Sequence, residues 1–411
     1  MRSINALGIW QDYALSISAF LLLPMLVLMP RGAVLVVCCA GLAAACLVWQ
    51  AGIGSIRRIR NLVLLFGLLV LIGAASALWS IAPLRSLAMA GRIGGLTVAG
   101  LCLVAAAPLV RTRLFLFSLA AGAATGILLA TFELASGGAI SNLFTNRGFA
   151  PTRINEAATL MALLVLPLAA TPLAGAWRGS FLLVAVALAV MVGVLSGTTA
   201  KLALVLGVVV AGLFYLDRRR AARVAGMLVA LGVITAPLIL PRLATSAAVL
   251  ETADSIKTSA SHRLLIWSFV GDHIAERPLL GWGLDTSRAI PGGKELFRPG
   301  QEKLPLHPHS AALQLWLELG IPGALLGTLL FSGLFFAVGG TGWPPLYAAA
   351  VGGTLMIALT ALLDSFSLWN ESWQAALWYS AFAVLVFARA PTAVERAVSL
   401  APNKQAAAVG A

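Results

Sequence analysis

The stretch SFLLVAVALAVMVGVLSG, residues 180–197, runs for eighteen residues without a charged side chain. A helix that crosses the hydrocarbon core of a bilayer needs about 20 predominantly apolar residues. The rest of the chain repeats this pattern, since 60% of its 411 residues are hydrophobic and 10% are charged. Soluble domains carry about a quarter charged residues. The sequence therefore predicts an all-α, polytopic membrane protein rather than a barrel, whose strands alternate in hydrophobicity over ~10-residue segments.

Hydrophobic runs separated by charged residues, glycine or proline predict about twelve transmembrane helices. We expect these spans at 14–30, 33–50, 61–80, 87–108, 114–136, 154–173, 180–197, 201–216, 224–243, 312–338, 344–363 and 372–388. They divide the chain into helices one to nine (1–243), a polar loop (244–311), helices ten to twelve (312–390) and a tail (391–411). The first run has no signal-peptide cleavage site before the second, so we expect it to be retained. The four cysteines lie inside hydrophobic runs and indicate no disulfide framework.

Lysine and arginine are distributed unevenly between the two sets of short loops. With the N-terminus inside, the cytoplasmic side holds fourteen basic residues, including the clusters at 57–60 and 218–223. The opposite side holds five, namely Arg31, Arg85, Arg147, Arg153 and Lys201. Because cytoplasmic loops are enriched in Lys and Arg, both termini are expected in the cytoplasm. Basic loops that face an anionic leaflet also account for the net charge of +13 without a nucleic-acid partner.

The loop 244–311 is the only long polar segment, and this topology places it outside the cytoplasm. It contains seven basic residues, seven acidic residues and all four histidines. HRLLIWSFVGDHIAERP (262–278) predicts an amphipathic helix. The alternative to a functional role is that this helix lies on the membrane surface and shields the bundle. PLLGWGLD (278–285) predicts a glycine turn, and AIPGGKELFRPGQEKLP (289–305) predicts an irregular loop. Since titratable groups are sparse elsewhere, chemistry is expected in this loop.

LPLHPHSAALQLWLELG (304–320) places His307 and His309 where the loop ends and a hydrophobic helix begins. Ser310 is a natural N-cap for that helix. The positive end of the helix dipole disfavours imidazolium, so the ring of His309 is expected to be neutral near pH 7. A neutral imidazole can act as a base or orient a hydroxyl, and the free N–H groups of a helix start can bind phosphate. The alternative is that both histidines are interfacial polar residues.

A metal site is a further alternative for the histidines. His262 and His273 are three turns apart on one predicted helical face and could join the histidine pair. However, no carboxylate or cysteine completes a familiar ligand spacing, and Pro308 restricts the geometry. The sequence therefore predicts no bound metal.

The motifs of this loop resemble those of the O-antigen ligase and polymerase family. That family has an arginine with a tryptophan four residues on, then P-x-x-G-x-G, then a His-Ser or His-Asn pair leading a helix with Gln, Glu and Gly-x-x-Gly. The matching residues are Arg263, Trp267, Pro278, Gly281, Gly283, His309, Gln314, Glu318, Gly320 and Gly323. Further matches at 78–87, 153–167 and 195–204 extend the resemblance over residues 78–323. The chain departs from the pattern at Lys201, where the family more often has Arg, and at Ser310, where Asn is commoner.

The resemblance implies a metal-independent glycosyltransferase of the bacterial inner membrane. Its donor would be a glycan on undecaprenyl diphosphate, and its acceptor a sugar hydroxyl of the lipid A-core, met on the periplasmic face. Preorganised cations stabilise the charge of a leaving diphosphate when no metal is present, and arginine binds phosphate bidentately. We accordingly expect Arg263 and His309 to be catalytic. Residues expected to bind substrate are Lys201, Arg153, Arg147, His307 and Trp267. The alternative for the basic residues is that they are interfacial and extend their charged ends toward the membrane surface, which is the favoured interpretation for Arg147.

Three functions remain open at this level. A ligase and a polymerase of O-antigen or exopolysaccharide would use the same donor, and the compact outer loop and short chain favour the ligase. A secondary transporter is the third, but 1–205 and 206–411 show no repeat of the kind common in transporters. Arg92, in the fourth predicted span, is compatible with a structural ion pair or with a ligand role.

Overall fold

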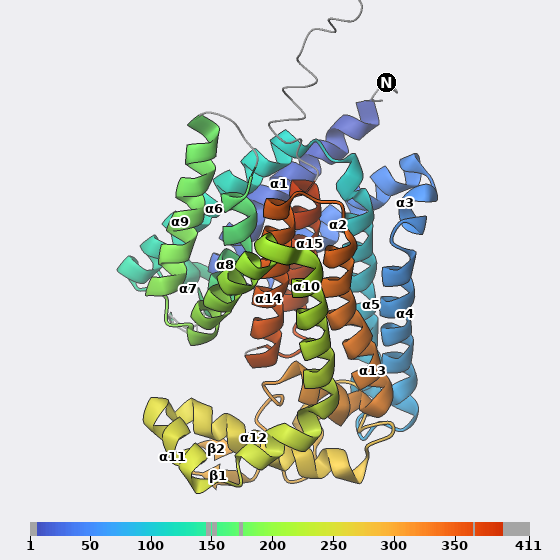
Figure 1. Cartoon of the computed structure of the whole chain (residues 1–411), viewed down its shortest axis with the longest axis vertical. Helices are drawn as coiled ribbons and strands as arrows, with labels where there is room; N and C mark the ends of the chain where they lie inside the picture. Colours follow the sequence, from blue (N-terminus) through green and yellow to red (C-terminus); the bar gives the residue numbers. More distant parts are fainter. Residues whose placement is uncertain (1–5, 145–148, 150–153, 172–175, 365, 389–411) are drawn as a thin grey trace, which may run out of the picture.

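Apolar helices make up almost all the regular structure in the computed structural model, which describes residues 6–144, 149, 154–171, 176–364 and 366–388 (Figure 1). The first eight helices are α1 (Ala6–Leu28), α2 (Gly32–Ala51), α3 (Gly54–Arg57), α4 (Arg60–Ala75), α5 (Pro83–Ala106), α6 (Thr112–Ser136), α7 (Ser141–Phe144) and α8 (Asn155–Ala169). They are followed by α9 (Ala176–Val194), α10 (Thr198–Leu243), α11 (Ala247–Ile256), α12 (Thr258–Glu276), α13 (Ala311–Gly340), α14 (Pro345–Asp364) and α15 (Glu371–Phe387). Short 3-10 turns are η1 (Ser76–Leu78), η2 (Ala107–Leu109) and η4 (Ser287–Ala289), and the strands are β1 (Leu296–Arg298) and β2 (Gln301–Glu302).

The helices confirm an all-α, polytopic membrane protein. Within the described ranges, nine helices are long and apolar enough to cross a bilayer. Each of the twelve predicted spans coincides with a helix or with one half of α10, which is 46 residues long and is broken at Asp217 by an extended backbone (φ −149°, ψ 92°). Helices α8 and α15 have 15 and 17 residues, shorter than a usual span. The number of bilayer crossings therefore stays a prediction.

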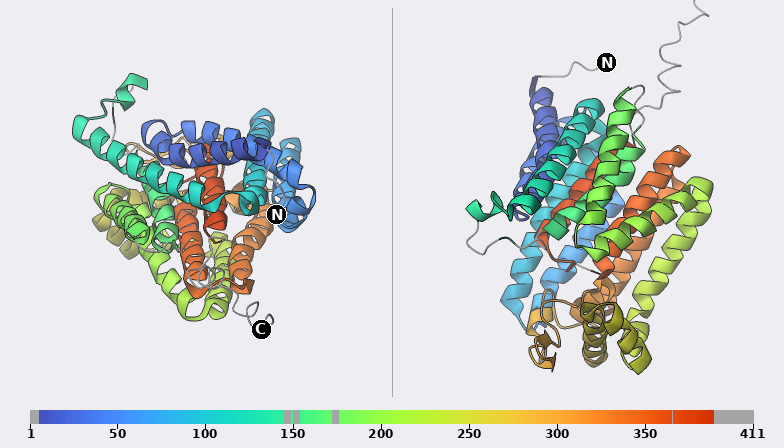
Figure 2. Two further views of the ribbon diagram at one scale, coloured as in Figure 1. Left: turned by 90° about the horizontal axis from the view of Figure 1, so that it is seen from above. Right: turned by 90° about the vertical axis from the view of Figure 1, so that its left-hand side faces the viewer.

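The two ends of the bundle differ in what they carry. α1 begins and α15 ends at one end, whereas α11, α12 and the β1–β2 hairpin lie at the other (Figure 1). The view from the side shows these loop elements gathered beneath the bundle (Figure 2). The basic segment after Asp217 lies at the end opposite the loop, because the Nη1 atom of Arg218 donates to the Trp343 carbonyl, ahead of α14. The loop and this basic segment therefore lie at opposite ends of the bundle, and the end that carries the loop is called the outer end because the sequence predicts it to face away from the cytoplasm.

Small residues allow the membrane helices to approach closely. Gly122 of α6 lies against the backbone of Phe20 in α1, where a Cβ atom would collide with the Phe20 carbonyl. Gly100 of α5 lies under the indole ring of Trp378 in α15. Without a hydrophobic driving force between helices in lipid, such close packing supplies much of the association energy.

The polar loop folds onto the ends of α10 and α13. Ile266 and Val270 of α12 are buried against Val233 of α10 and Leu313 and Leu317 of α13. The predicted helix at 262–278 is thus confirmed, although α12 begins earlier, at Thr258. One face of α12 packs against other helices of the protein rather than only against lipid.

The expectation of an irregular loop at 289–305 is wrong in part. β1 and β2 form a small antiparallel pair, with Leu296 opposite Glu302. The connecting residues are Pro299 and Gly300, and Gly300 has φ +75°. Pro-Gly at the centre of a turn favours type II geometry, which brings the flanking residues together as a hairpin.

Candidate functional site

The HPHS turn at the start of α13 places two imidazole rings side by side. Ser310 caps the helix, with its hydroxyl accepting from the Leu313 N–H at 3.4 Å, so the predicted N-cap is confirmed. His309 has φ +51°, in the left-handed region that a residue other than glycine rarely adopts. Its backbone N–H donates to Nδ1 of His307 at 3.1 Å, and the two ring centroids are 4.2 Å apart.

The ring of His307 is held in its neutral form. It is 9% exposed, and burial lowers its pKa to about 3, with further lowering by His309, Arg288 and Arg263. Because Nδ1 accepts the hydrogen bond from His309, the proton of the neutral ring belongs on Nε2. The positive charges of Arg263 and Arg288 act on this ring and further disfavour its imidazolium form.

Helix α12 supports the turn through Trp267. Its indole N–H donates to the Pro308 carbonyl at 3.0 Å, between the two histidines. Arg263 lies one helical turn earlier on α12 and is partly exposed. The structure therefore brings together four residues that the sequence assigned to the site: Arg263, Trp267, His307 and His309. The hydrogen bond from Trp267 to Pro308 is structural, and the assignment of Trp267 to substrate binding stays a prediction.

The glycine turn after α12 lies directly on a break in α13. Gly320 has φ +60° and interrupts the helix, and a Cβ atom there would collide with the carbonyl of Leu279. At Gly281, which also has positive φ, a Cβ atom would meet the backbone of Glu318. The Trp282 N–H donates to the Leu317 carbonyl at 2.9 Å, and the Gly283 N–H donates to the Glu318 carbonyl at 2.8 Å. These family-motif glycines thus permit the loop and α13 to be joined by backbone hydrogen bonds.

A fully buried carboxylate, that of Glu318, is the centre of this junction. Oε2 accepts from the Asp285 N–H and from the Trp369 indole N–H, each at 2.5 Å. Oε1 accepts from the Ser287 hydroxyl at 2.5 Å and from the Gln314 amide at 3.2 Å. Glu318 therefore connects the loop and α13 to the segment between α14 and α15.

Two ion pairs surround this junction on the side of α5. The Nε atom of Arg85 lies 2.9 Å from Oδ2 of Asp285, and burial raises the pKa of Asp285 while the Arg85 guanidinium opposes that rise. Nη1 of Arg92 lies 2.9 Å from Oε1 of Glu371. Of the two roles that the sequence left open for Arg92, the structure thus shows the ion pair.

Of the remaining predicted site residues, Lys201 is the one that lies within the described ranges. Lys201 lies one turn into α10, near the hydrogen bond between Ser196 and Asn155 at 3.2 Å, and no contact among the described residues joins it to Arg263 or the histidine pair. Arg147 and Arg153 lie outside the described residues.

The other two histidines bind backbone carbonyls. His262 lies 2.8 Å from the Glu302 carbonyl, and His273 lies 2.9 Å from that of Phe269. In the part of the chain that the structure describes, no three His, Cys, Asp or Glu side chains are grouped as metal ligands. Both histidines therefore serve the packing of the loop.

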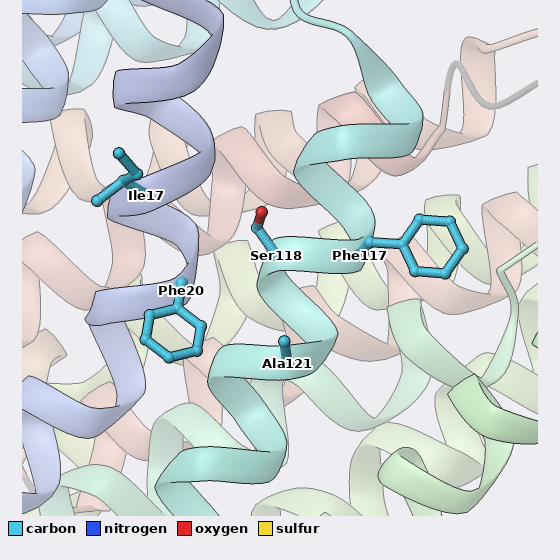
Figure 3. Close-up of a pocket in the computed structure, with 5 residues that line it drawn as sticks. All are labelled: Ile17, Phe20, Phe117, Ser118 and Ala121. Atoms are coloured by element: carbon cyan, nitrogen blue, oxygen red, sulfur yellow. The ribbon is translucent and has the colours of Figure 1, made fainter.

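A groove of about 470 Å³ lies elsewhere, between α1 and α6 (Figure 3). Ile17 and Phe20 line it from α1, and Phe117, Ser118 and Ala121 line it from α6. Because it contains no titratable group, it offers none of the acid, base or cation that a transfer reaction needs. The candidate site is therefore the outer end of α13.

Three residues of this end were not given a role by the sequence: Glu318, Asp285 and Arg288. Glu318 had two available signals: it is one of the residues that match the family motif, and an ionisable residue within an apolar helix is a functional or structural residue by default. Asp285 and Arg288 had none, because their roles depend on contacts between segments far apart in the chain.

Comparison with known proteins supports the same region. Residues 182–327 match the family model described as O-antigen ligase. A protein of Rickettsia conorii, provisionally named a polysaccharide ligase, is 30% identical over 265 residues, which cover 61% of this chain and 62% of that protein. A relative with the same provisional name in Rickettsia felis is 30% identical over 266 residues, with the same coverage. A third, in Rickettsia typhi, is 35% identical over 133 residues, covering 31% of this chain and 33% of that protein. The predicted resemblance is thus confirmed, and the matched part of this chain spans less than two thirds of each relative's length.

Proposed function

We propose that this chain, whose residues 182–327 match the O-antigen ligase family model, is a ligase-type glycosyltransferase. It moves a glycan from undecaprenyl diphosphate to a sugar hydroxyl of the lipid A-core, without a metal ion. The reaction takes place on the periplasmic face of a bacterial inner membrane, with both termini of the protein in the cytoplasm. The partners are therefore two glycolipids and the surrounding membrane lipids.

The observation that carries this proposal is the cluster at the outer end of α13. The ring centroids of His307 and His309 are 4.2 Å apart, and the charges of Arg263 and Arg288 act on His307. Transfer from a diphosphate requires a group to take the proton of the attacking hydroxyl and cations to stabilise the leaving phosphate. Imidazole and guanidinium side chains supply these two requirements.

In the proposed step, the acceptor hydroxyl oxygen attacks the anomeric carbon of the donor sugar. The bond between that carbon and the diphosphate oxygen breaks, and the electron pair leaves with the diphosphate. His309 orients the hydroxyl and takes its proton. Arg263 binds the diphosphate through its guanidinium fork and stabilises the added negative charge.

The other assigned residues bind the substrates. His307, neutral and buried, orders the approach to His309, and Trp267 contributes its ring face because its N–H is already bound to Pro308. Lys201, near the start of α10, and Arg147 and Arg153, on another predicted outer loop, supply positive charge to the lipid-linked donor.

The test is a deletion strain together with the purified full-length protein in lipid vesicles. A ligase should leave free lipid-linked polymer and bare lipid core in the deletion strain. The purified protein should transfer glycan in the presence of a chelator and without nucleotide or an ion gradient. Lipid cores capped by single repeat units would indicate a polymerase instead, and loss of transfer with chelator would overturn the metal-independent mechanism.

A further inference from the structure

Arg92 and Glu371 form an ion pair inside the membrane part of the helix bundle. Nη1 of Arg92 lies 2.9 Å from Oε1 of Glu371. Arg92 belongs to the candidate span Pro83–Leu109 and lies about 14 Å along the axis of α5 from Pro83, at a rise of ~1.5 Å per residue. Glu371 is the first residue of α15. The two charges are therefore held at a depth where the sequence predicts hydrocarbon.

The outward side of this pair is left open by the residues that the structure describes. The Arg92 side chain is 53% exposed, and that of Glu371 is 35% exposed. Gly91 and Gly95 of α5 are exposed as well, and a Cβ atom at either position would meet no described atom within 4 Å outside its own stretch of helix. We call the surface formed by Gly91, Arg92, Gly95 and Glu371 the α5–α15 polar face.

Charged side chains at this depth need polar surroundings. Ionisable residues within membrane spans almost always face the bundle interior or a water-filled space, because facing hydrocarbon is costly. A lone arginine can extend its charged end to the interface. Arg92 is instead bound to Glu371, whose place is set by the capped start of α15, where Asn370 accepts from the Trp373 N–H at 2.9 Å. The polar face therefore requires water or a polar ligand on its open side.

The hydrogen-bonding groups of the pair favour an uncharged ligand. The guanidinium of Arg92 has five N–H donors. Nε donates to the Ala88 carbonyl at 3.4 Å and Nη1 to Glu371, whereas Nη2 and the Oε2 atom of Glu371 bind no residue in the described ranges. The two charges neutralise each other, and Arg92 is also one of the charges that oppose the rise in pKa that burial gives Asp285. An anion gains little from such a pair, but a hydroxyl or amide group, which both donates and accepts, matches a spare donor beside a spare acceptor.

The polar face is connected to the junction that carries the candidate site. Trp369, two residues before Glu371, donates to Oε2 of Glu318 at 2.5 Å. Arg85 lies seven residues before Arg92, hence on the same face of α5, and pairs with Asp285 at 2.9 Å. A molecule at the polar face would thus lie on the membrane side of the junction, with the histidine pair beyond it at the outer start of α13.

We propose that the α5–α15 polar face binds hydroxyl and amide groups of the acceptor glycolipid, on the sugars that carry its acyl chains. This inference rests on the proposed function, because that function makes a glycolipid the acceptor. In the donor a diphosphate separates the lipid tail from the first sugar, so an anion would come to this depth. In lipid A the acyl chains are attached to the sugars directly, which brings uncharged polar groups close to the hydrocarbon.

The kinetic test uses the full-length protein in lipid vesicles, with Arg92→Ala and Glu371→Ala compared with Arg220→Ala. Arg220 forms an exposed ion pair with Asp217, at 3.3 Å, at the opposite end of the bundle, so its variant breaks a matched pair away from the site. Both Arg92→Ala and Glu371→Ala should raise the acceptor KM roughly 10- to 100-fold, the range expected for a lost hydrogen bond to a charged group, with the donor KM and kcat changed less. The unfolding temperature should match that of Arg220→Ala, because exposed pairs contribute little stability.

Arg92→Lys separates ligand binding from a structural ion pair. Lysine keeps the charge opposite Glu371 but replaces the guanidinium fork by a single ammonium. The acceptor KM should therefore stay above the wild-type value, and full recovery in Arg92→Lys would show a purely structural pair and overturn the proposal. A rise in the donor KM alone, or an acceptor KM equal to that of Arg220→Ala, would overturn it as well.

A direct binding test separates this inference from the proposed function. The probe is lipid A-core from a strain that makes no O-antigen, added without donor to the purified protein in lipid nanodiscs. It should bind more weakly to Arg92→Ala than to Arg220→Ala, and lipid A without core sugars should show the same difference. If the wild type transfers no glycan, the proposed function fails, but this difference still supports the site. Equal binding by the two variants refutes the site even if transfer is observed, and a difference confined to the complete core refutes the placement beside the acyl chains.

Discussion

Glu133 and Glu318 are both fully buried carboxylates near the end of a membrane helix, yet they connect very different lengths of chain. Glu133, in α6, accepts from the N–H groups of Ile140 and Ser141 and from the Ser141 hydroxyl. Its partners thus lie seven and eight residues away. Glu318, in α13, accepts from Asp285, Ser287 and Trp369 as well as from the adjacent Gln314.

Glu133 forms a local cap, whereas Glu318 forms a junction between distant segments of the chain. The carboxylate of Glu133 closes one turn, and closing a short loop orders few residues. That of Glu318 joins segments 33 residues before it and 51 residues after it, so its hydrogen bonds depend on the whole outer end being assembled. The candidate site is built on the long-range junction. Changes at Glu318 should therefore reduce activity strongly, and changes at Glu133 should reduce it little.

The largest effect is expected for Glu318→Gln. The substituted amide brings N–H donors to a site where Asp285 and Trp369 also donate, so at least one buried donor loses its acceptor, at about 1–3 kcal/mol for each group. Transfer should fall below detection, and the unfolding temperature in detergent should drop. Transfer assays and thermal unfolding of the purified variant measure both. Wild-type activity in a stable variant would show that the junction is dispensable for the site.

The second-largest effect is expected for His309→Ala, at the start of the same helix, and it should exceed that of His307→Ala. A positioned acid or base contributes typically ~10²–10⁴-fold in rate, so His309→Ala should reduce kcat by about that factor with donor binding largely kept. His307→Ala should lose clearly less. Steady-state kinetics with a separate donor-binding assay distinguish the two. Equal impairment would indicate a shared structural or metal role, and lost donor binding in His309→Ala would make His309 a diphosphate ligand.

A smaller effect is expected for Arg263→Lys, on α12. A lysine keeps the charge but cannot reproduce the bidentate guanidinium fork. Transfer should fall about 10-fold or more, while insertion and accumulation of the protein remain normal. Immunoblotting of membranes alongside the transfer assay checks both points. Near-normal transfer would indicate that Arg263 has an interfacial structural role and not a catalytic one.

The smallest effect is expected for Glu133→Gln, the matched control for Glu318→Gln. One oxygen remains for the backbone N–H groups of the local turn, so the cost should be about 1 kcal/mol. Transfer should stay within about twofold of wild type, since the change is confined to the turn between α6 and α7. If this variant lost as much activity as Glu318→Gln, the distinction between local cap and long-range junction would be wrong.

Hydrophobic runs were sufficient to predict the helices of this protein, because a bilayer requires long apolar segments whose backbone bonds are internal. The N-cap at Ser310 and the helix at 262–278 were predictable for a similar reason, as both depend on residues close in the sequence. The β1–β2 hairpin was missed although Pro299 and Gly300 were a visible turn signal.

The candidate site was predictable only in part. The spacing of Arg263, Trp267 and His309 identified the region through the family resemblance. The ion pair between Arg85 and Asp285 joins residues 200 positions apart, and no local pattern indicates such a contact. The roles of Lys201, Arg147 and Arg153 stay predictions.

The junction at Glu318 also sets an order of events during synthesis. Trp369 follows Asp285 by 84 residues in the chain. At ~5–20 residues per second, the ribosome needs roughly 4–17 seconds to extend the chain from one to the other. Until Trp369 is made, the Glu318 carboxylate lacks its indole donor, and α15, which begins at Glu371, has not been synthesised. The hydrogen bonds of this junction can therefore be completed only after Trp369 has been synthesised, and a nascent chain that stalls before Trp369 would lack the last of them.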